Sequence, residues 1–545
     1  MPKGEFDYIV IGSGAAGLVG AITASRLGLR PLIVEKADSW GGTTATSGGV
    51  LWVPRNDLMI EQGSADSAAQ AQSYVRALLG EGAGPRESAK ADAFLEHAPL
   101  MARMLAEEGF RWMRSDTHPD YYPGVPGWAI GRTIESAPFD GSRLGSRFAT
   151  MRLAESNLPA ISSDQFGTLT RAKTTPGLFW EAARTTIDHK IRTWLGQRPL
   201  GNGRALAASL MAIVQTHGIP VRLSTRLVEL VVEHGRVTGS VVECDGKRER
   251  LDAPAGLLLA AGGFARNREL RKELQGREQF WTNAVAEDEG DAFLAATRIG
   301  AASELTDDCW WMPSIQVGPD QNGLALGLRA LPGSIIVDAT GRRYMNEARS
   351  YMTTGKALYE HGAAKERHWL IMDGKFLRRY IFAELSQKAI RDQMLALGTL
   401  KRAGSILELA RQCGIDPAAL QGTVERFNGF AREGRDLDFH RGETAYDAYW
   451  ADPNHRPNPS LGQIRNGPFW AAVVRPGDLG TNGGLKTDRH GRVLDAFDSP
   501  INGLYAAGNG SGSPFGRAYP GAGATIAAAA TFGYLASHHA SSLKK

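Results

Sequence analysis

Gly12-Ser-Gly-Ala-Ala-Gly17, near the N-terminus, is the stretch of sequence that decides the fold. An apolar run at residues 6–11 predicts a strand before it, residues 18–27 predict a helix, and residues 31–34 predict a second strand that ends in Glu35. Together they form a βαβ unit with the dinucleotide-binding fingerprint, in which Gly14 lets the backbone approach a pyrophosphate and Glu35 accepts hydrogen bonds from a ribose. A GxGxxG pattern alone is weak evidence, but this context makes nucleotide binding a specific prediction.

Two further segments identify the nucleotide. The loop at residues 41–49 combines glycines with hydroxyl donors, and Gly503-Leu-Tyr-Ala-Ala-Gly-Asn509 is the kind of segment that flavoproteins fold back onto the same cofactor. We therefore expect FAD, bound non-covalently because the 41–49 loop contains no His or Cys. The residues expected to bind it are Gly12, Ser13, Gly14, Ala15, Ala16, Gly17, Glu35, Lys36, Gly41, Gly42, Thr43, Thr44, Ser47, Gly48, Gly49, Val228, Ala261, Gly262, Gly508, Asn509, Gly523, Ala524 and Thr525.

The FAD segments stand at opposite ends of a 545-residue chain, so the intervening chain must leave one domain and return to it. Alternating residues at 221–242 predict a hairpin, and the apolar run at 257–261 predicts a strand that returns to the nucleotide sheet. From about residue 309 tryptophan and methionine cluster and short strands alternate with polar helices. We predict an α/β fold in which a discontinuous Rossmann-like FAD-binding domain, residues 1–308 and 481–545, carries an inserted α+β catalytic domain at 309–480.

Composition excludes several other classes of protein. With 43% hydrophobic and 22% charged residues the chain is globular, and a net charge of +4 without a dense Lys/Arg run argues against a nucleic-acid partner. Cys244, Cys309 and Cys413 are far apart and match no metal-ligand or CxxC spacing, so we expect reduced thiols and no metal. The start of the chain offers no signal core, and no apolar stretch is long enough to span a membrane, which together predict a cytoplasmic protein.

The segment at 171–198 allows two interpretations. Ala183, Ile187, Ile191 and Leu195 recur at helical spacing, with tryptophans and basic residues around them. A basic amphipathic helix of this kind can lie on an anionic membrane, at the inner face of the cell membrane in this case. We favour the second interpretation, a surface helix packed on the body of the protein. We also predict that residues of about 150–200 form an insertion in the FAD-binding domain, which lies at the protein surface or docks on a membrane.

Five short motifs resemble those of 3-ketosteroid Δ1-dehydrogenases, within the fumarate reductase and succinate dehydrogenase flavoprotein superfamily. They are Pro119-Asp-Tyr-Tyr122, Gly341-Arg-Arg-Tyr-Met-Asn-Glu347, Phe439-His-Arg-Gly-Glu443, and the segments 478–488 and 503–523. The resemblance covers nearly the whole chain except residues 125–200. It implies a 3-ketosteroid substrate held between the FAD domain and the inserted domain.

The resemblance also implies a catalytic set of three tyrosines and one backbone amide, Tyr121, Tyr351, Tyr519 and Gly523. In this scheme Tyr519 and the Gly523 amide bind the C3 carbonyl and stabilise an enolate, and Tyr351 takes the C2 proton with help from Tyr121. The hydride at C1 then passes to the flavin. A loop-fixing role is expected for His440 and Arg441, whereas Trp310, Trp311 and Met312 could line the substrate site or fill the core between the domains.

Three rival functions remain open at this stage. A 3-ketosteroid dehydrogenase acting at C4–C5 would use the same carbonyl clamp with a different base. A fumarate-type enoate reductase would need an arginine acid and carboxylate clamps, for which Arg349, Arg441 and Arg517 are candidates. A flavin-binding redox sensor would lack turnover. With no second dinucleotide fingerprint for NAD(P)H, a quinone or another carrier is the expected electron acceptor.

Overall fold

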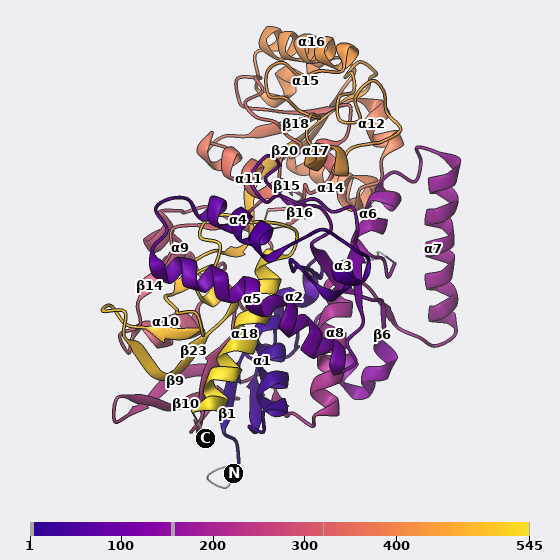
Figure 1. The fold of residues 1–545 in the computed structure, drawn as a ribbon. Helices are drawn as coiled ribbons and strands as arrows, with labels where there is room; N and C mark the ends of the chain where they lie inside the picture. Colours follow the sequence, from indigo (N-terminus) through magenta and orange to yellow (C-terminus); the bar gives the residue numbers. More distant parts are fainter. Residues whose placement is uncertain (1–4, 154–158, 320, 544–545) are drawn as a thin grey trace.

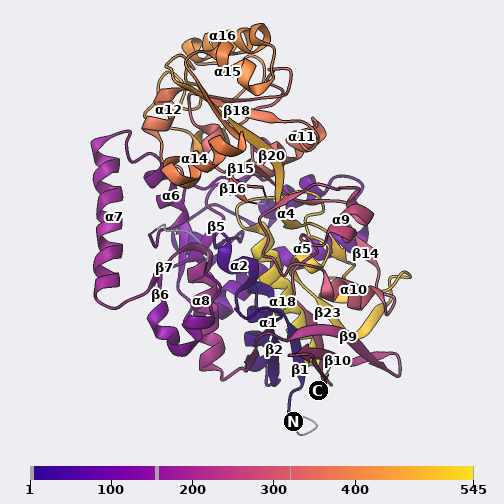
Figure 2. The same cartoon turned by 180° about the vertical axis from the view of Figure 1, so that it is seen from behind.

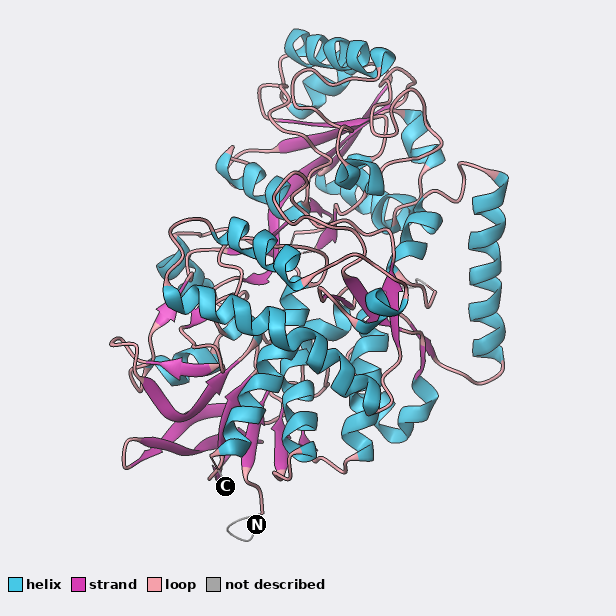
Figure 3. Cartoon of the chain, viewed as in Figure 1, coloured by secondary structure: helices cyan, strands magenta, loops and turns pink. Residues whose placement is uncertain are grey.

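The computed structural model describes residues 5–153, 159–319 and 321–543. Its two lobes are visible in Figure 1: both termini lie in one lobe, and residues of the middle of the chain form the other. Residues 154–158 of the predicted 150–200 insertion lie outside the described residues. Figure 3 shows that strands and helices contribute to both lobes, which agrees with the predicted α/β class.

A nine-stranded sheet organises the lobe that holds the termini. Its strand order is β11-β10-β23-β12-β1-β2-β8, with β22 paired to β23 and β9 paired to β10. The strands are β1 Tyr8–Ile11, β2 Pro31–Val34, β8 Val221–Arg222, β9 Arg226–Glu233, β10 Arg236–Cys244, β11 Lys247–Asp252, β12 Gly256–Leu259, β22 Arg492–Leu494 and β23 Pro500–Ala506. Strands from both ends of the chain are therefore neighbours, as the predicted discontinuous domain requires.

Both faces of this sheet are buried. The central parallel strands β1, β2 and β12 are short apolar runs without exposed positions, which is typical of a parallel sheet covered on both sides. Tyr8 and Val10 face α1 (Ala15–Arg26) and α18 (Ala524–Ser542), whereas Ile9 and Ile11 face α9 (Arg268–Gln275) and α10 (Asp291–Thr297). The predicted 221–242 hairpin is confirmed as β9–β10 and the predicted 257–261 strand as β12.

Two predicted boundaries differ in the structure. The first strand begins at Tyr8 and not at residue 6, and the helix after the glycine turn begins at Ala15 and not at residue 18. The helix starts earlier because Gly14 is its extended N-cap residue, so the second half of the glycine motif is already helical. The glycine motif therefore lies at the very start of the helix.

A seven-stranded sheet organises the other lobe. Its order is β16-β15-β20-β18-β17, with β13 and β19 also paired to β20. The strands are β13 Trp281–Thr282, β15 Cys309–Gln316, β16 Asn322–Leu324, β17 Ser334–Val337, β18 His368–Met372, β19 Leu400–Ala403 and β20 Phe469–Thr481. Since β13 precedes residue 309, this sheet draws on chain outside the predicted insert, and the division at 308 and 480 stays a prediction.

Helices and smaller sheets complete both lobes. The remaining helices are α2 Gly42–Thr46, α3 Asp57–Glu61, α4 Ala68–Leu79, α5 Pro85–Glu107, α6 Ser163–Thr170, α7 Pro176–Trp194, α8 Asn202–Thr216, α11 Tyr351–Glu360, α12 Gly374–Arg379, α13 Ala383–Ser386, α14 Lys388–Leu397, α15 Ile406–Cys413, α16 Pro417–Glu433 and α17 Ala445–Trp450. The short strands are β3 Val50–Trp52, β4 Trp112–Ser115, β5 Thr133–Ser136, β6 Phe139–Asp140, β7 Pro199–Leu200, β14 Ser303–Glu304 and β21 Gly484–Leu485, and the 3₁₀ helices are η1 Gly141–Thr150, η2 Leu328–Ala330 and η3 Gly508–Gly510.

Helix α7 corrects the favoured interpretation of residues 171–198. It stands at one side of the molecule, separated from the main body in both views (Figures 1 and 2). Ile187 and Ile191 are about half exposed, and Trp180 and Trp194 are 68% and 85% exposed. The predicted helix is confirmed, but its apolar stripe faces solvent and does not pack on the body, where only the opposite face, at Ala182, is buried.

Candidate active site

Three tyrosines from distant parts of the chain meet where the two lobes join. The ring centroids of Tyr121 and Tyr351 are 5.1 Å apart, those of Tyr121 and Tyr519 5.5 Å, and those of Tyr351 and Tyr519 5.3 Å. All three side chains are buried. Tyr121 lies in the loop between β4 and β5, Tyr351 is the first residue of α11, and Tyr519 lies in the loop before α18. The structure therefore brings together the three predicted tyrosines.

Main-chain contacts fix Tyr121 against the segment that carries Tyr519. The Tyr121 amide donates to the Pro520 carbonyl at 2.9 Å, and the Tyr519 amide donates to the Tyr122 hydroxyl at 3.2 Å. The adjacent Asp120 is buried and accepts hydrogen bonds from Trp52 at 2.7 Å and from Arg132 at 2.6 Å. Tyr122 thus ties two loops together through its hydroxyl, while the Tyr121 ring contacts the rings of both other tyrosines.

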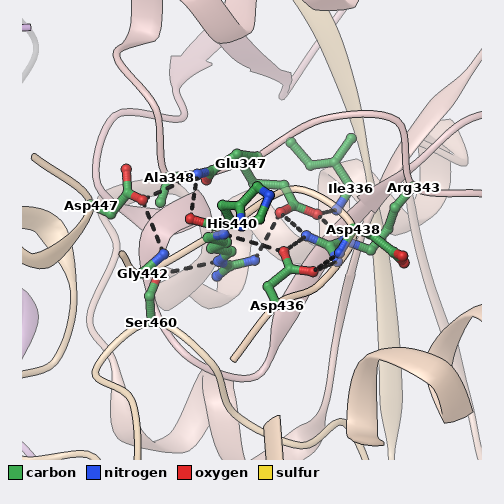
Figure 4. Close-up of polar contacts among 12 residues, drawn as sticks. Ile336, Arg343, Glu347, Ala348, Asp436, Asp438, His440, Gly442, Asp447 and Ser460 are labelled. Atoms are coloured by element: carbon green, nitrogen blue, oxygen red, sulfur yellow. Dashed lines mark hydrogen bonds and ion pairs between the residues drawn. The ribbon is translucent and has the colours of Figure 1, made fainter. Parts of the chain in front are cut away.

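A buried ionic network holds the turn that leads into Tyr351 (Figure 4). The Glu347 carboxylate accepts hydrogen bonds from Arg343 at 2.8 and 2.9 Å and from Arg441 at 3.2 Å. Arg343 also donates to Asp436 at 2.9 Å. Burial would raise the pKa of Glu347, but the two guanidinium groups outweigh it and hold that pKa below its usual value. Glu347 therefore stays ionised, and the turn before α11 is rigidly anchored.

Arg441 has the loop-fixing role expected from its motif. Besides Glu347, its guanidinium donates to the carbonyls of Ser334 and Leu331 at 2.8 and 2.9 Å and is fully buried. His440 instead lies at the surface, 58% exposed, beside Glu443. Of this predicted pair, only the Arg441 side chain therefore fixes the 439–443 loop from its buried side.

Gly523 ends the loop from Tyr519 and begins α18. Its φ of +80° belongs to the left-handed region, and a Cβ there would lie 1.9 Å from the Val50 carbonyl oxygen. Only glycine fits this position. The Tyr519 hydroxyl lies 3.1 Å from the Thr525 hydroxyl, close to the positive end of the α18 dipole. A phenol O–H and the amides at a helix N-terminus thus converge where a ligand oxygen could bind.

The buried tyrosines are held neutral in this arrangement. Burial raises the pKa of Tyr351 and of Tyr121 well above the usual range, and neighbouring phenols add to the effect. Hydrogen bonding between the two lowers the pKa of Tyr121 and raises that of Tyr351. Burial also raises the pKa of Tyr519, while the Thr525 hydroxyl and the Gly523 amide oppose the rise. Neutral phenols are good donors, so any ionised phenol here needs added electrostatic support.

The glycine motif forms a cradle whose dimensions suit a pyrophosphate. A Cβ at Gly12 or at Gly17 would lie 2.4 Å or 1.9 Å from a carbonyl oxygen, so the inner side of the turn is closed. A Cβ at Gly14 would meet only the Thr44 hydroxyl, at 3.4 Å, and one at Gly48 would meet nothing within 4 Å. Gly14 provides no side-chain cap for α1, and the Ala15 amide donates to the Thr44 hydroxyl at 3.0 Å, so the amides that follow Ala15 are the helix N–H groups that this open side would present to an anion. These residues fit the diphosphate of FAD.

The other predicted cofactor residues divide into two groups. The Glu35 carboxylate accepts from the Ser13 amide at 3.0 Å and from its hydroxyl at 2.6 Å, which ties the acidic residue to the glycine loop. Gly508 lies against both α1 and α18, so the return segment adjoins the first cradle. By contrast Lys36 pairs with Asp291 at 2.9 Å and with Glu289, and Val228 is the extra residue of a β-bulge in β9.

Around these positions sequence reasoning left the role of Trp310 open and missed Asp120 and Asp288. Trp310, left open above, donates to the Asn509 side chain at 3.1 Å and packs edge-on to Tyr519 at 5.2 Å, so it joins the cofactor segment to the tyrosines. Asp288 is buried beside Gly262, and burial raises its pKa to about 7. Asp120 stood inside a quoted motif and could have been found there, whereas no local pattern marked Asp288.

The comparisons with known proteins agree with this geometry. Residues 7–526 match the family model described as "FAD binding domain". The chain is 39% identical to a 3-oxosteroid 1-dehydrogenase of Mycolicibacterium smegmatis, over 98% of this chain and 96% of that protein. It is 35% identical to a 4-oxocyclohexanecarboxylate 2-dehydrogenase of Sinomonas cyclohexanicum, over 98% and 92%. A solved 3-ketosteroid Δ1-dehydrogenase of Sterolibacterium denitrificans, in complex with 1,4-androstadiene-3,17-dione, superposes with a TM-score of 0.92 at 36% identity, over 99% of both chains.

Fold and site together define a flavoprotein that binds FAD. Within that class the chain belongs to the 3-oxosteroid 1-dehydrogenase family of flavin-dependent oxidoreductases that act on CH–CH bonds. The described residues contain no helix that is long and apolar enough to cross a membrane. Over the same residues no group of three or more His, Cys, Asp or Glu side chains could hold a metal ion.

Proposed function

We propose that this chain catalyses the FAD-dependent 1,2-dehydrogenation of 3-ketosteroids to 1-ene products. The observation that carries the proposal is the convergence of Tyr121, Tyr351 and Tyr519 at the N-terminus of α18. The family of the chain and its similarity to a dehydrogenase solved with a steroid dienone support the same substrate class.

The chain's own residues would divide the work as follows. The Tyr519 hydroxyl and the Gly523 amide donate hydrogen bonds to the C3 carbonyl, whose oxygen gains negative charge as the enolate forms. Tyr351, in its phenolate form, takes the proton from C2, and Tyr121 is within reach to share that proton. When bound, FAD supplies the two-electron acceptor for the hydride that leaves C1. The C1–H and C2–H bonds break and a C1–C2 double bond forms, so atoms and electrons balance.

Two of the three arginines named as candidates for an enoate reductase, Arg441 and Arg517, are engaged elsewhere. Arg441 is fully buried in the Glu347 network. Arg517 pairs with Asp307 at 2.9 Å at the protein surface. Neither side chain is available to clamp a substrate carboxylate, which favours a ligand with an uncharged carbonyl.

Helix α7 is the candidate for contact with a membrane. Phe179, Trp180, Ile187, Ile191 and Trp194 share one exposed face, and Lys190 lies among them. Exposed aromatic and aliphatic side chains with cations beside them suit the headgroup region of an anionic bilayer. We propose peripheral contact there, which would place the enzyme near apolar steroids and near a membrane quinone as electron acceptor.

The first test is anaerobic mixing of FAD-loaded protein with androst-4-ene-3,17-dione while flavin absorbance is followed. Bleaching, with the 1,4-diene as product, supports the proposal. Bleaching by 4-oxocyclohexanecarboxylate but not by the steroid would instead indicate that the substrates are small cyclic ketones. No bleaching by either ketone, with reoxidation of reduced flavin by fumarate, would overturn the proposal in favour of a reductase.

A further inference from the structure

Arg329, in η2, is a buried cation without a carboxylate partner. The residue is fully buried, and among the described residues no acidic side chain forms an ion pair with it. Arg132, Arg271 and Arg441 are equally deep, yet each pairs with an aspartate or glutamate. An unpaired buried charge is costly and therefore uncommon. The charge of Arg329 is thus available to stabilise a negative charge that forms close by.

One edge of the Arg329 guanidinium holds the turn before Tyr351. Its Nη1 donates to the Arg349 carbonyl at 2.5 Å and to the Glu347 carbonyl. These carbonyls lie two and four residues before Tyr351. Nε and Nη2 are buried, and neither makes a hydrogen bond of ordinary distance and angle to a described residue. Arg329 is therefore tied to the backbone that presents the proposed base, and the N–H donors of Nε and Nη2 are left over.

The unused side of Arg329 lies near a second row of phenols. η2 packs on α17, which carries Tyr446. The Tyr446 hydroxyl is buried close to the Arg329 guanidinium and the Trp450 indole, although no hydrogen bond of ordinary distance and angle joins it to a described residue. Its ring centroid is 5.1 Å from that of Tyr121, which in turn is 5.1 Å from that of Tyr351. A row of aromatic rings thus runs from the guanidinium to the proposed base.

The charges around this row favour a phenolate over other anions. Burial raises the pKa of Tyr446, and the Arg329 guanidinium opposes the rise. Burial lowers the pKa of Arg329, whereas the phenols of Tyr446 and Tyr121 oppose that shift and Arg441 reinforces it. Glu347 is compensated by Arg343 and Arg441. Other groups around Tyr121 and Tyr351 are the phenols of Tyr519 and Tyr449 and the imidazole of His118, 6.2 Å from the Tyr121 ring, whose pKa burial lowers to about 4. Arg329 is the cation whose charge these groups leave uncompensated.

Dehydrogenation by this route needs an ionised base, because a neutral phenol is a very poor acceptor for the C2 proton. The base must first become a phenolate, and burial opposes that ionisation in Tyr351. Resting on the function proposed above, we propose that Arg329 is a positioning residue whose positive charge stabilises the phenolate shared by Tyr351 and Tyr121, while its two carbonyl contacts hold Tyr351 in place. No bond to Arg329 forms or breaks, and its proton stays on the guanidinium throughout.

The test compares three arginine variants in the FAD-loaded protein. The rate of flavin reduction by androst-4-ene-3,17-dione is measured against pH for wild type, Arg329→Met, Arg329→Gln and Arg329→Lys. The neutral variants are expected to raise the apparent pKa of the base by about 1 to 3 units, the range for a charge close to a titrating group, and to slow reduction at neutral pH by about 10- to 1000-fold, with little change in steroid affinity. Lysine keeps the charge but loses it readily when buried, so Arg329→Lys should match wild type at neutral pH and fall away at alkaline pH.

A second readout needs no steroid. Near-ultraviolet absorbance during a pH titration reports phenolate formation, and Tyr351→Phe identifies the part of the signal that belongs to the pair. That part should appear at higher pH in Arg329→Met than in wild type. Unchanged titrations and rate profiles in all folded variants, Arg329→Lys included, would overturn the proposal. A wild-type protein that no 3-ketosteroid reduces would instead refute the proposed function, and the titration would still decide the role of Arg329.

Discussion

Tyr351 is where the proposed chemistry is most directly tested. Tyr351→Phe removes the phenol oxygen, the atom of this side chain that would take the proton, and keeps the ring contacts with Tyr121 and Tyr519. Flavin reduction by androst-4-ene-3,17-dione is expected to slow by about 100- to 10,000-fold, the usual contribution of a general base, with steroid affinity retained. Tyr344→Phe is the matched control, since the Tyr344 hydroxyl binds His368 at 2.8 Å, apart from the cluster. Equal rates in wild type and Tyr351→Phe would exclude Tyr351 as the base.

Burial of Tyr351 also predicts how the reaction depends on pH. The base acts in its deprotonated form, and burial raises the pKa of Tyr351 above the ordinary 10.0 of tyrosine. The phenolate fraction therefore grows as pH rises, and the rate of flavin reduction is expected to rise from neutral to alkaline pH without a plateau near neutrality. Stopped-flow measurement across that range checks this. A rate that is independent of pH would show that proton removal from C2 is not limiting or uses another group.

Gly523 tests the fit of the backbone at the carbonyl clamp. Gly523→Ala adds a methyl group in the left-handed region and 1.9 Å from the Val50 carbonyl, so the α18 N-terminus must move. We expect a loss of about 1 to 3 kcal/mol in unfolding free energy and a large loss of flavin reduction. Gly28→Ala is the control that introduces backbone strain without a steric clash. Gly28 has a similar φ of +82°, and an added Cβ there would have nothing within 4 Å. Denaturant unfolding and reduction rates that match in the two variants would contradict the assignment.

At the scale of elements, the Glu347 network before α11 makes the stability of the fold depend on pH in the acid range. The pKa values of Glu347 and Asp436 are lower in the folded state than their ordinary 4.5 and 3.8. Groups with depressed folded pKa values stabilise the fold above their unfolded pKa, and this contribution is lost as pH falls through the folded pKa. Glu347→Gln should cost about 3 kcal/mol near neutrality and flatten the decline below pH 4.5. Denaturant unfolding between about pH 3 and 7 measures both effects, and an unchanged slope would contradict them.

Helix α7 offers a second test at this scale. Replacing both Trp180 and Trp194 with serine removes two exposed aromatic side chains and should sharply reduce sedimentation with anionic phospholipid vesicles. Flavin reduction by dissolved steroid should be unchanged. Phe497→Ser is the matched control, because Phe497 is 89% exposed but lies outside α7. Vesicle binding that survives in the double variant would remove α7 as the site of membrane contact.

At the scale of the whole molecule, bound FAD should contact segments from both ends of the chain and thereby stabilise the fold. β1, β12 and β23 are neighbours, and Gly508 lies against α1 and α18. Because FAD binds only the folded form, loading at about 100 times the dissociation constant should add about 2.7 kcal/mol of stability. Hydrogen exchange should show protection at residues 12–17 and 503–525 together when FAD is added back to apoprotein. Protection confined to the N-terminal segment would mean that the return segment does not complete the site.

The sequence was most informative where function imposes a local backbone pattern. The glycine turn, its helix and Glu35 form a contiguous unit, so the nucleotide fold followed from adjacent residues, with errors of a few residues at element ends. The three tyrosines were found only through the resemblance of their motifs, since a tyrosine by itself says nothing of its neighbours. Helix α7 was predicted correctly as a helix and wrongly as a packed one, because an amphipathic stripe does not reveal what covers it.

The sequence by itself determined the FAD fingerprint and the discontinuous domain, because both rest on spacing along the chain, and the resemblance of its short motifs indicated the residues of the candidate site. Only the tertiary structure decided that Tyr121, Tyr351 and Tyr519 share one buried cluster and that Arg329 lies near it without a carboxylate. The pKa of a phenol and the availability of a charge depend on burial and on neighbours distant in sequence. Those quantities arise only when the two lobes pack together, and no stretch of residues contains them.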